Sequence, residues 1–248
     1  MNYGLWMSAA GLSTEVHRQD VISNNIANAE TTGFKADYAF TRERPIARTE
    51  LGADVPAQEL LERLGGGVLA DRTWTDFAQG DLRSTGAPLD LALEGGGFFV
   101  VQDSDGDAFT RDGRFTRSHR GELVDLDGRP VMSARGRTIR LPEGEISIDE
   151  TGTVFVDDEE IASLRLAAPA TDTLRKVGGN LFKSSATDVP DATEVRVQQG
   201  MVEGSGVDAI GSLTDLIEAG RNVQAAARFI DFHDRMMELA VTRIGVSA

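Results

Sequence analysis

Residues 213–244, LTDLIEAGRNVQAAARFIDFHDRMMELAVTRI, carry the strongest periodic signal in the sequence. Ten positions recur here at alternating intervals of three and four, and eight of them are apolar. That spacing marks one narrow face of an α-helix. A face so narrow stabilises a helix only when another helix covers it. The positions are Leu213, Leu216, Gly220, Val223, Ala227, Ile230, Asp234, Met237, Val241 and Ile244.

The other end of the chain has a similar pattern, which predicts an N-terminal amphipathic helix. Its positions are Leu5, Ala9, Leu12, Val16, Gln19, Ser23 and Ile26. Two such helices are expected to pair as a coiled coil, either as a hairpin on a globular core or together with helices of neighbouring subunits. Large apolar residues off this face favour neighbouring subunits, because one helix pair cannot bury them. They are Trp6, Met7, Phe229, Phe232 and Met236.

The middle of the chain has the pattern of β structure. Residues 89–93 alternate in polarity, residues 98–101 form a short apolar run, and 146–148 and 154–156 resemble short strands. Turn signals separate them, which predicts an antiparallel β domain. The signals are Asp105-Gly106, Asp112-Gly113, Arg120-Gly121, Asp127-Gly128 and Thr151-Gly152. The expected fold class is therefore α+β.

This organisation predicts five segments. They are an N-terminal helix (1–35), an extended connector (36–85), a central antiparallel β domain (86–190), a return connector (191–209) and a C-terminal helix (210–248). Within the first connector, Pro56 opens a short helical patch at 58–64 that Gly65–Gly67 ends.

Charge and composition exclude several classes of protein. The 248 residues contain 40 acidic and 25 basic side chains, a net charge of −15, and no cysteine. The missing thiols exclude a disulfide scaffold and a cysteine nucleophile. The acidic excess argues against nucleic acid as a partner. Residues 36–210 carry −13 of the charge, so the near-neutral ends are expected to pack while the middle faces water.

No candidate for chemistry is convincing. Asp103, Asp105 and Asp107 alternate as in a calcium loop, but Ala108 and Arg114 stand where glycine and glutamate are needed, so a hairpin turn is expected. The three histidines are widely separated, which argues against zinc. Gly95–Gly97 precedes a strand and is expected to be a turn, as is the acidic run 157–160. We therefore expect no enzyme activity, cofactor or metal.

Targeting signals are also missing from the sequence as it stands. The first charged residue is Glu15, so residues 1–14 lack the cationic start of a secretory signal peptide. They are too short to span a bilayer, and charges at 231–238 interrupt the C-terminal stretch. We expect no membrane insertion, and either a cytoplasmic protein or one exported without a cleavable signal.

Eight short blocks, in order along nearly the whole chain, resemble the flagellar rod and hook family. They are Asn24–Asn28 (NNIAN), Thr31–Lys35 (TTGFK), Gln79–Leu82 (QGDL), Thr85–Leu93 (TGAPLDLAL), Gly97–Val101 (GFFVV), Phe109–Phe115 (FTRDGRF), Gly121–Val124 (GELV) and Gln199–Ser205 (QGMVEGS). Gly206 and Asp208 depart from the family's two asparagines. The length and residues 226–230 favour the proximal rod subgroup, with the distal rod subgroup as the alternative.

The resemblance implies a structural subunit of the bacterial flagellar basal-body rod, in the periplasm, that polymerises axially through its terminal helices and transmits torque for motility. It implies partners among copies of the same chain, other proximal and distal rod proteins and the flagellar type III export apparatus. A soluble β-domain hydrolase or carbohydrate-binding module with a helical hairpin, and a cytoplasmic two-helix adaptor, are the alternatives from other classes.

Two sets of residues follow from this interpretation. The assembly interface is expected to comprise Leu5, Leu12, Val16, Ile26, Leu216, Val223, Ile230, Met237, Val241 and Ile244. The family-motif turn is expected to comprise Asn25, Asn28, Thr31, Thr32, Gly33, Phe34 and Lys35. Gly33 is expected to supply backbone freedom and Phe34 an anchor. The terminal helices are expected to be largely disordered in the monomer and to order on assembly.

Overall fold

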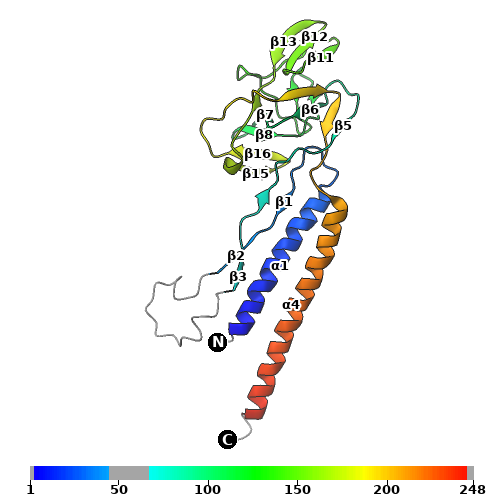
Figure 1. Cartoon of the computed structure of the whole chain (residues 1–248). Helices are drawn as coiled ribbons and strands as arrows, with labels where there is room; N and C mark the ends of the chain where they lie inside the picture. Colours follow the sequence, from blue (N-terminus) through cyan, green and yellow to red (C-terminus); the bar gives the residue numbers. More distant parts are fainter. Residues whose placement is uncertain (1–2, 45–66, 245–248) are drawn as a thin grey trace. The chain divides into compact units, whose positions relative to one another are not determined.

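The computed structural model describes residues 3–44 and 67–244, and its fold is α+β (Figure 1). A long helix lies near each end of the chain, and antiparallel strand pairs lie between them. The chain divides into two compact units. The helical unit comprises Met1–Ala27, Asp37–Asp76 and Asp208–Ala248, and the β unit comprises Asn28–Ala36 and Phe77–Val207.

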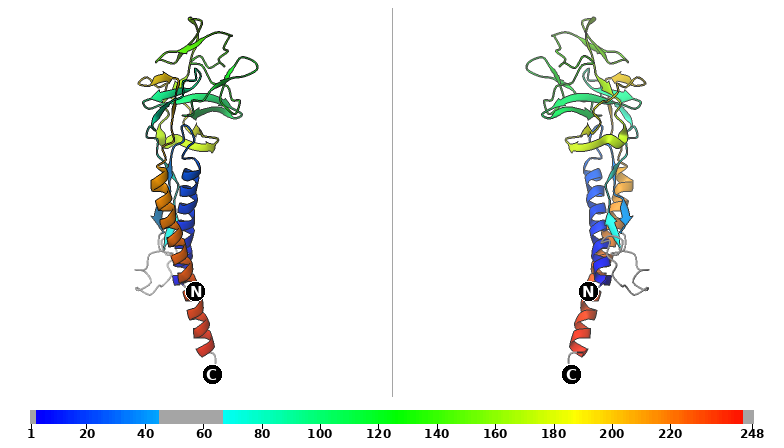
Figure 2. Two further views of the ribbon diagram at one scale, coloured as in Figure 1. Left: turned by 90° about the vertical axis from the view of Figure 1, so that its right-hand side faces the viewer. Right: turned by 90° about the vertical axis from the view of Figure 1, so that its left-hand side faces the viewer.

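Helices α1 (Tyr3–Ala27) and α4 (Ala209–Ile244) lie side by side in the helical unit (Figures 1 and 2). The imidazole of His233 in α4 comes so close to Gly4 that a Cβ there would lie 3.0 Å from it. Helix α4 continues for 11 residues past His233, about 16 Å at 1.5 Å per residue. The C-terminal part of α4 therefore extends beyond the start of the described part of α1.

Asp208 caps the N-terminus of α4. Its carboxylate accepts hydrogen bonds from the amides of Ile210 and Gly211, both at 3.1 Å, and its carbonyl accepts one from Ser212 at 2.9 Å. A carboxylate in this position satisfies amides that lack helical partners and interacts favourably with the helix dipole. The departure from the family's asparagine is thus chemically conservative.

The described parts of the first connector form two short strand pairs in the helical unit. Strand β1 (Asp37–Tyr38) pairs with β4 (Trp74–Thr75), and β2 (Thr41–Glu43) pairs with β3 (Val68–Ala70), both antiparallel. The pattern of the sequence did not indicate these pairs, because each strand has only two or three residues. The helical patch expected at 58–64 lies outside the described residues.

Most strands of the β unit form a five-stranded and a three-stranded antiparallel sheet. The first has the order β14-β7-β8-β16-β15 and the second β11-β12-β13, and three further pairs are β5-β18, β6-β17 and β9-β10. The bounds are β5 (Leu82–Ser84), β6 (Leu91–Glu94), β7 (Phe98–Asp103), β8 (Gly106–Thr110), β9 (Thr116–Arg117), β10 (Leu123–Val124), β11 (Ile146–Ile148), β12 (Thr153–Val156), β13 (Glu159–Ser163), β14 (Leu166–Ala167), β15 (Leu174–Gly178), β16 (Leu181–Ser184), β17 (Arg196–Gln199) and β18 (Met201–Glu203).

Strand β7 is apolar at consecutive positions because both of its faces are buried. Phe99 and Val101 belong to the larger core cluster, whereas Phe98 and Val100 belong to a second cluster with Phe182. This alternation explains why residues 98–101 do not show the polarity pattern of a strand with one wet face. The expected buried strand is confirmed.

The acidic turn between β7 and β8 is a hairpin, in which Asp103 pairs with Gly106. Its carboxylates face protein cations: Lys183 lies 2.9 Å from Asp103, and Arg165 lies 2.6 Å from Asp107. The hydrogen bond from Lys183 holds the pKa of Asp103 below its ordinary value. The expected hairpin turn is confirmed.

Candidate functional site

The motif turn lies between α1 and the first strand of the chain. Asn25 is buried, and its side-chain amide donates to the carbonyl of Asp37 at 2.6 Å and accepts from the amide of Asp37 at 3.0 Å. After α1 ends, the amide of Thr31 donates to the carbonyl of Asn28 at 3.1 Å, and the two side chains hydrogen-bond at 3.2 Å. Asn25 therefore holds backbone with its side-chain amide, and Asn28 holds Thr31 with its backbone carbonyl and its side-chain oxygen, as residues that favour caps and turns do.

Gly33 and Phe34 both pack closely against neighbouring residues in the turn. Gly33 has φ of +67°, and a Cβ there would collide with the backbone of Arg111. Phe34 is buried, with the ammonium of Lys176 4.2 Å from the centre of its ring. The carbonyl of Thr32 accepts a hydrogen bond from the side chain of Asn180 at 2.6 Å. The turn is therefore packed into the β unit as well as hydrogen-bonded.

Lys35 belongs to a buried charge cluster with Arg111 and Glu203. Its ammonium lies 2.6 Å from one oxygen of the Glu203 carboxylate, and Arg111 lies 3.0 Å from the other. All three side chains are at most 3% exposed. We name these three residues the buried triad.

Backbone groups add three hydrogen bonds to the buried triad. The ammonium of Lys35 donates to the carbonyl of Ala78 at 2.7 Å, and the guanidinium of Arg111 donates to the carbonyl of Gly95 at 2.6 Å. The amide of Gly80 donates to the Glu203 carboxylate at 2.8 Å. Buried charges are tolerated only when they are paired and hydrogen-bonded in this way.

Burial removes water from the guanidinium of Arg111. Burial lowers the pKa of Arg111 below its ordinary value, and the charge of Glu203 and its hydrogen bond oppose that shift. The Nε atom of Arg111 has no hydrogen-bond partner among the described residues. Since an arginine guanidinium stays protonated in proteins, the site combines two cations with one carboxylate.

Four of the sequence blocks meet at the buried triad. Lys35 comes from TTGFK, Gly80 from QGDL, Arg111 from FTRDGRF and Glu203 from QGMVEGS. The blocks can be found in the sequence, but their spacing does not show that they meet in the folded protein. The blocks contain charged residues, but FTRDGRF has three of them and Gly80 of QGDL carries none, so residue type does not show which charges pair.

The face of α1 that lies against α4 is made of small and polar residues. Gly4 lies next to His233, and the carboxylate of Glu15 accepts a hydrogen bond from Asn222 at 3.4 Å. Ser8 and Gly11 fall on the same face, at the 4-3-4 spacing, and are half-buried. Of the α1 residues predicted for the assembly interface, Leu5 and Val16 are 36% and 40% exposed, and Leu12 and Ile26 are half-buried.

Only part of the predicted spacing in α4 coincides with burial among the described side chains. Leu216, Val223 and Ile230 are half-buried, and Ala219 is fully buried. Ala227 and Asp234, which belong to the predicted 3-4 repeat, are exposed, whereas the residues before them, Ala226 and His233, are half-buried. The half-buried positions are therefore one residue earlier here, and the imidazole of His233 lies next to Gly4 of α1. Met237 is exposed, and the side chains of Val241 and Ile244 lie outside the described part of the structure.

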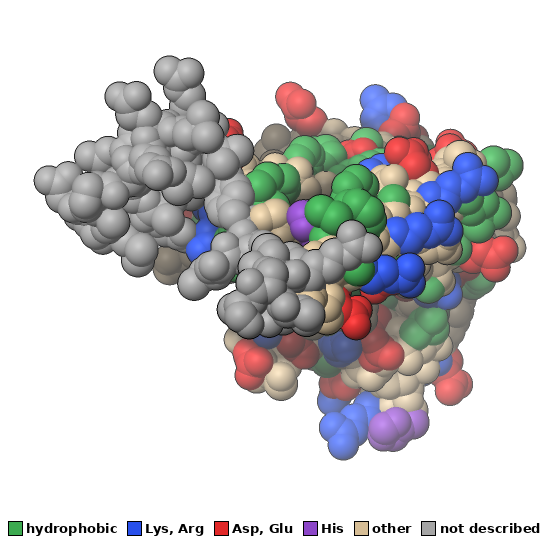
Figure 3. Space-filling model, turned by 90° about the horizontal axis from the view of Figure 1, so that it is seen from below, with side chains coloured by type: hydrophobic (Ala, Val, Ile, Leu, Met, Phe, Trp, Pro, Cys, Tyr) green, Lys and Arg blue, Asp and Glu red, His purple; other side chains and the backbone are tan. Residues whose placement is uncertain are grey.

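Large apolar side chains remain exposed on both helices. They are Trp6, Met7, Ile210, Leu213, Ile217, Phe229, Phe232, Met236 and Leu239. Ala225, Arg228, Phe229 and Phe232 line a shallow groove of 420 Å³ along α4. Exposed hydrophobic side chains are visible among charged ones in the view from below (Figure 3). Contiguous exposure of this kind marks interaction surfaces in soluble proteins.

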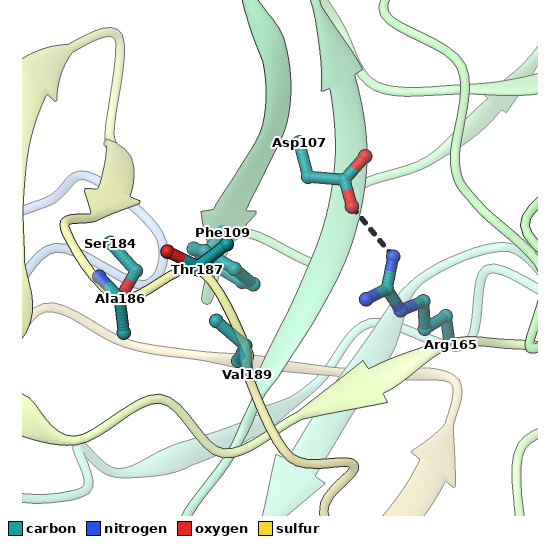
Figure 4. A pocket seen from close by; sticks show the side chains of 7 residues that line it. All are labelled: Asp107, Phe109, Arg165, Ser184, Ala186, Thr187 and Val189. Carbon is teal, nitrogen blue, oxygen red and sulfur yellow. Dashed lines mark hydrogen bonds and ion pairs between the residues drawn. The ribbon is translucent and has the colours of Figure 1, made fainter.

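A separate pocket of 140 Å³ lies in the β unit (Figure 4). Its lining contains one carboxylate, that of Asp107, which is paired with Arg165 at 2.6 Å. This pair of side chains offers no second carboxylate for acid–base chemistry.

Among the described residues, no group of three or more His, Asp or Glu is placed to bind a metal ion. Within the same residues, neither helix has the length and apolar character needed to cross a bilayer.

Comparison with known proteins matches three parts of the chain to flagellar families. Residues 7–35 match the flagella basal body rod protein family, residues 92–156 the flagellar hook protein FlgE/F/G D1 domain, and residues 198–243 the flagellar basal body rod FlgEFG protein C-terminal family. The first and third ranges include Lys35 and Glu203, respectively.

Curated relatives cover almost the whole chain. The flagellar basal-body rod protein FlgF of Caulobacter vibrioides is 32% identical over 99% of both chains. The flagellar basal-body rod protein FlgG of Borreliella burgdorferi is 32% identical over 97% of this chain and 98% of its own, and that of Bacillus subtilis is 28% identical over 94% and 96%. The chain belongs to the FlgF/FlgG family of flagellar basal-body rod proteins.

Proposed function

We propose that this structural subunit of the basal-body rod is a proximal rod protein of the FlgF type, which polymerises axially through α1 and α4 and transmits torque. The observation that carries the proposal is the exposure of Phe229, Phe232 and Met236, at 63%, 59% and 54%, on a helix that already has a partner. Burying such side chains against a neighbouring helix contributes about 1.5 to 3 kcal/mol each. The distal rod role of FlgG remains the alternative.

The partners of this surface would be copies of the same chain and other rod proteins. At these contacts we expect burial of the ten residues predicted for the assembly interface, together with the large apolar residues that lie off the 3-4 repeat. Residues 1–35 and 210–248 would form the axial core. The coiled-coil geometry of that core, export through the type III apparatus and assembly in the periplasm belong to the same proposal.

The function is tested in a strain that lacks the gene. We expect no swimming and basal bodies without a completed rod, with both restored by the wild-type gene on a plasmid. Normal swimming with complete rods in the deletion strain would contradict the rod function. Complementation by a gene for the distal rod protein alone would contradict the proximal assignment.

The terminal helices are expected to be weakly ordered in the isolated monomer. Among their described side chains, the only apolar one that is fully buried is Ala219, whereas both core clusters lie in the β unit. Local stability follows buried apolar contact. Amide exchange on the monomer should therefore be at least about a hundredfold faster in α1 and α4 than in β7. Equal protection of helices and strands would refute this prediction.

A further inference from the structure

The segment Asn28–Ala36 belongs to the β unit although the chain on both sides of it belongs to the helical unit. Its three apolar residues are Ala29, Phe34 and Ala36. The other six residues are polar or glycine, and residues 32–35 all make hydrogen-bonded contacts with other parts of the β unit. Such contacts fix a segment in one position more specifically than apolar packing does.

Two backbone hydrogen bonds join this segment to the end of the β unit. The amide of Gly33 donates to the carbonyl of Glu203 at 2.7 Å, and the amide of Gly206 donates to the carbonyl of Phe34 at 2.9 Å. Lys35, which follows Phe34, forms an ion pair with the carboxylate of Glu203. The first and last parts of the β unit are thus held together at three successive points.

The buried triad lies near the points where the chain passes from one unit to the other. These passages follow residues 27, 36, 76 and 207. Lys35 stands next to the last residue of its segment, and its ammonium binds the carbonyl of Ala78, two residues after the third passage. Glu203 stands four residues before the last one. Three of the four passages therefore have a residue of this hydrogen-bonded cluster within a few residues.

We propose that Lys35, Arg111 and Glu203 act as a clamp that holds these connecting segments together at the β unit, as positioning residues of the rod subunit. Opening the clamp leaves buried charges without a partner, so it opens rarely and as a whole. In the rod, the clamp makes the β unit and its connectors bear load as one body. Only this last, mechanical step rests on the proposed function.

The clamp is tested on the purified full-length chain by amide exchange in the variant Glu203→Gln, which leaves two buried cations without their carboxylate. We expect exchange at Gly33 and Gly206 to become at least about a hundredfold faster, with less than about a threefold change in β7. The matched control is Asp107→Asn, which breaks an ion pair of the same 2.6 Å length that is 26% and 39% exposed. It should change neither region by more than about threefold.

A uniform acceleration in all regions, or no acceleration at Gly33 and Gly206, would overturn the clamp. Should the variant fail to fold, the wild-type chain in increasing urea gives the same answer: the two amides must open before β7, with a smaller urea dependence. Opening together with β7 at every concentration would also overturn it.

The load-bearing step is tested in cells that carry Glu203→Gln. We expect these cells to keep the chain in their basal bodies but to lose swimming in viscous medium. Normal swimming there would refute that step alone.

Discussion

Replacing Phe229 and Phe232 together with aspartate is expected to abolish rod completion and swimming. Both side chains are more than half exposed in the chain, so the unfolding temperature of the purified protein should change by no more than about 2 °C. In an assembled rod the same positions would place two carboxylates in an apolar helix contact, which costs several kcal/mol. Swimming assays and electron microscopy of basal bodies measure the effect.

The control for this variant is Asp231→Asn, an exposed change between the two phenylalanines on the same helix. It should leave swimming at the wild-type level. Complete rods in the double aspartate variant would show that this face of α4 is not an assembly surface. A fall in unfolding temperature of more than about 5 °C would assign the phenylalanines to the fold of the subunit instead.

Replacing Gly33 with alanine is expected to destabilise the protein by at least about 4 kcal/mol and to lower its unfolding temperature by about 10 °C. Two effects add: φ of +67° is unfavourable for alanine, and the new Cβ would collide with the backbone of Arg111. The backbone at Arg111 and the motif turn would have to move apart, which disturbs the buried triad. Calorimetry on the purified chain measures the change.

Gly86→Ala separates the two effects. Gly86 has φ of +73°, but a Cβ there would meet no atom within 4 Å. This variant should lose only the backbone preference, about 1 to 2 kcal/mol, or about 4 °C. Equal losses at Gly33 and Gly86 would mean that the motif turn is not packed against Arg111.

Local patterns in the sequence predicted those parts of the fold that depend on neighbouring residues. The 3-4 repeat predicted α4, and its N-terminus has the cap that a carboxylate at Asp208 supplies. The turn signals predicted the hairpin at Asp105 and the turn at Gly33. In each case the decisive contacts join residues a few positions apart, so spacing and residue type are enough.

The buried triad could not be predicted in this way. Lys35 and Glu203 are 168 residues apart, and Arg111 and Glu203 are 92 residues apart. The 40 acidic side chains offer many possible partners for one lysine. Only the arrangement of the strands selects Glu203, and that arrangement depends on contacts across the whole β unit.

Apolar spacing alone does not show which residues of α1 lie against α4. Apolar spacing suggested that Leu5 and Val16 lie against α4, but Gly4 allows His233 a closer approach than a leucine would. Close approach of backbones favours small residues, so the apolar residues are left facing outward. Their exposure leaves them available to further helices, as the assembly interface requires.

A density map of purified basal bodies in which this chain is traced tests whether the subunit assembles into the rod through its terminal helices. We expect the chain within the rod, with α1 and α4 packed against helices of neighbouring subunits and the side chains of Phe229 and Phe232 buried between them. A rod that lacks the chain, or one in which these two side chains face solvent and only the β units touch, would show that α1 and α4 are not the assembly surface.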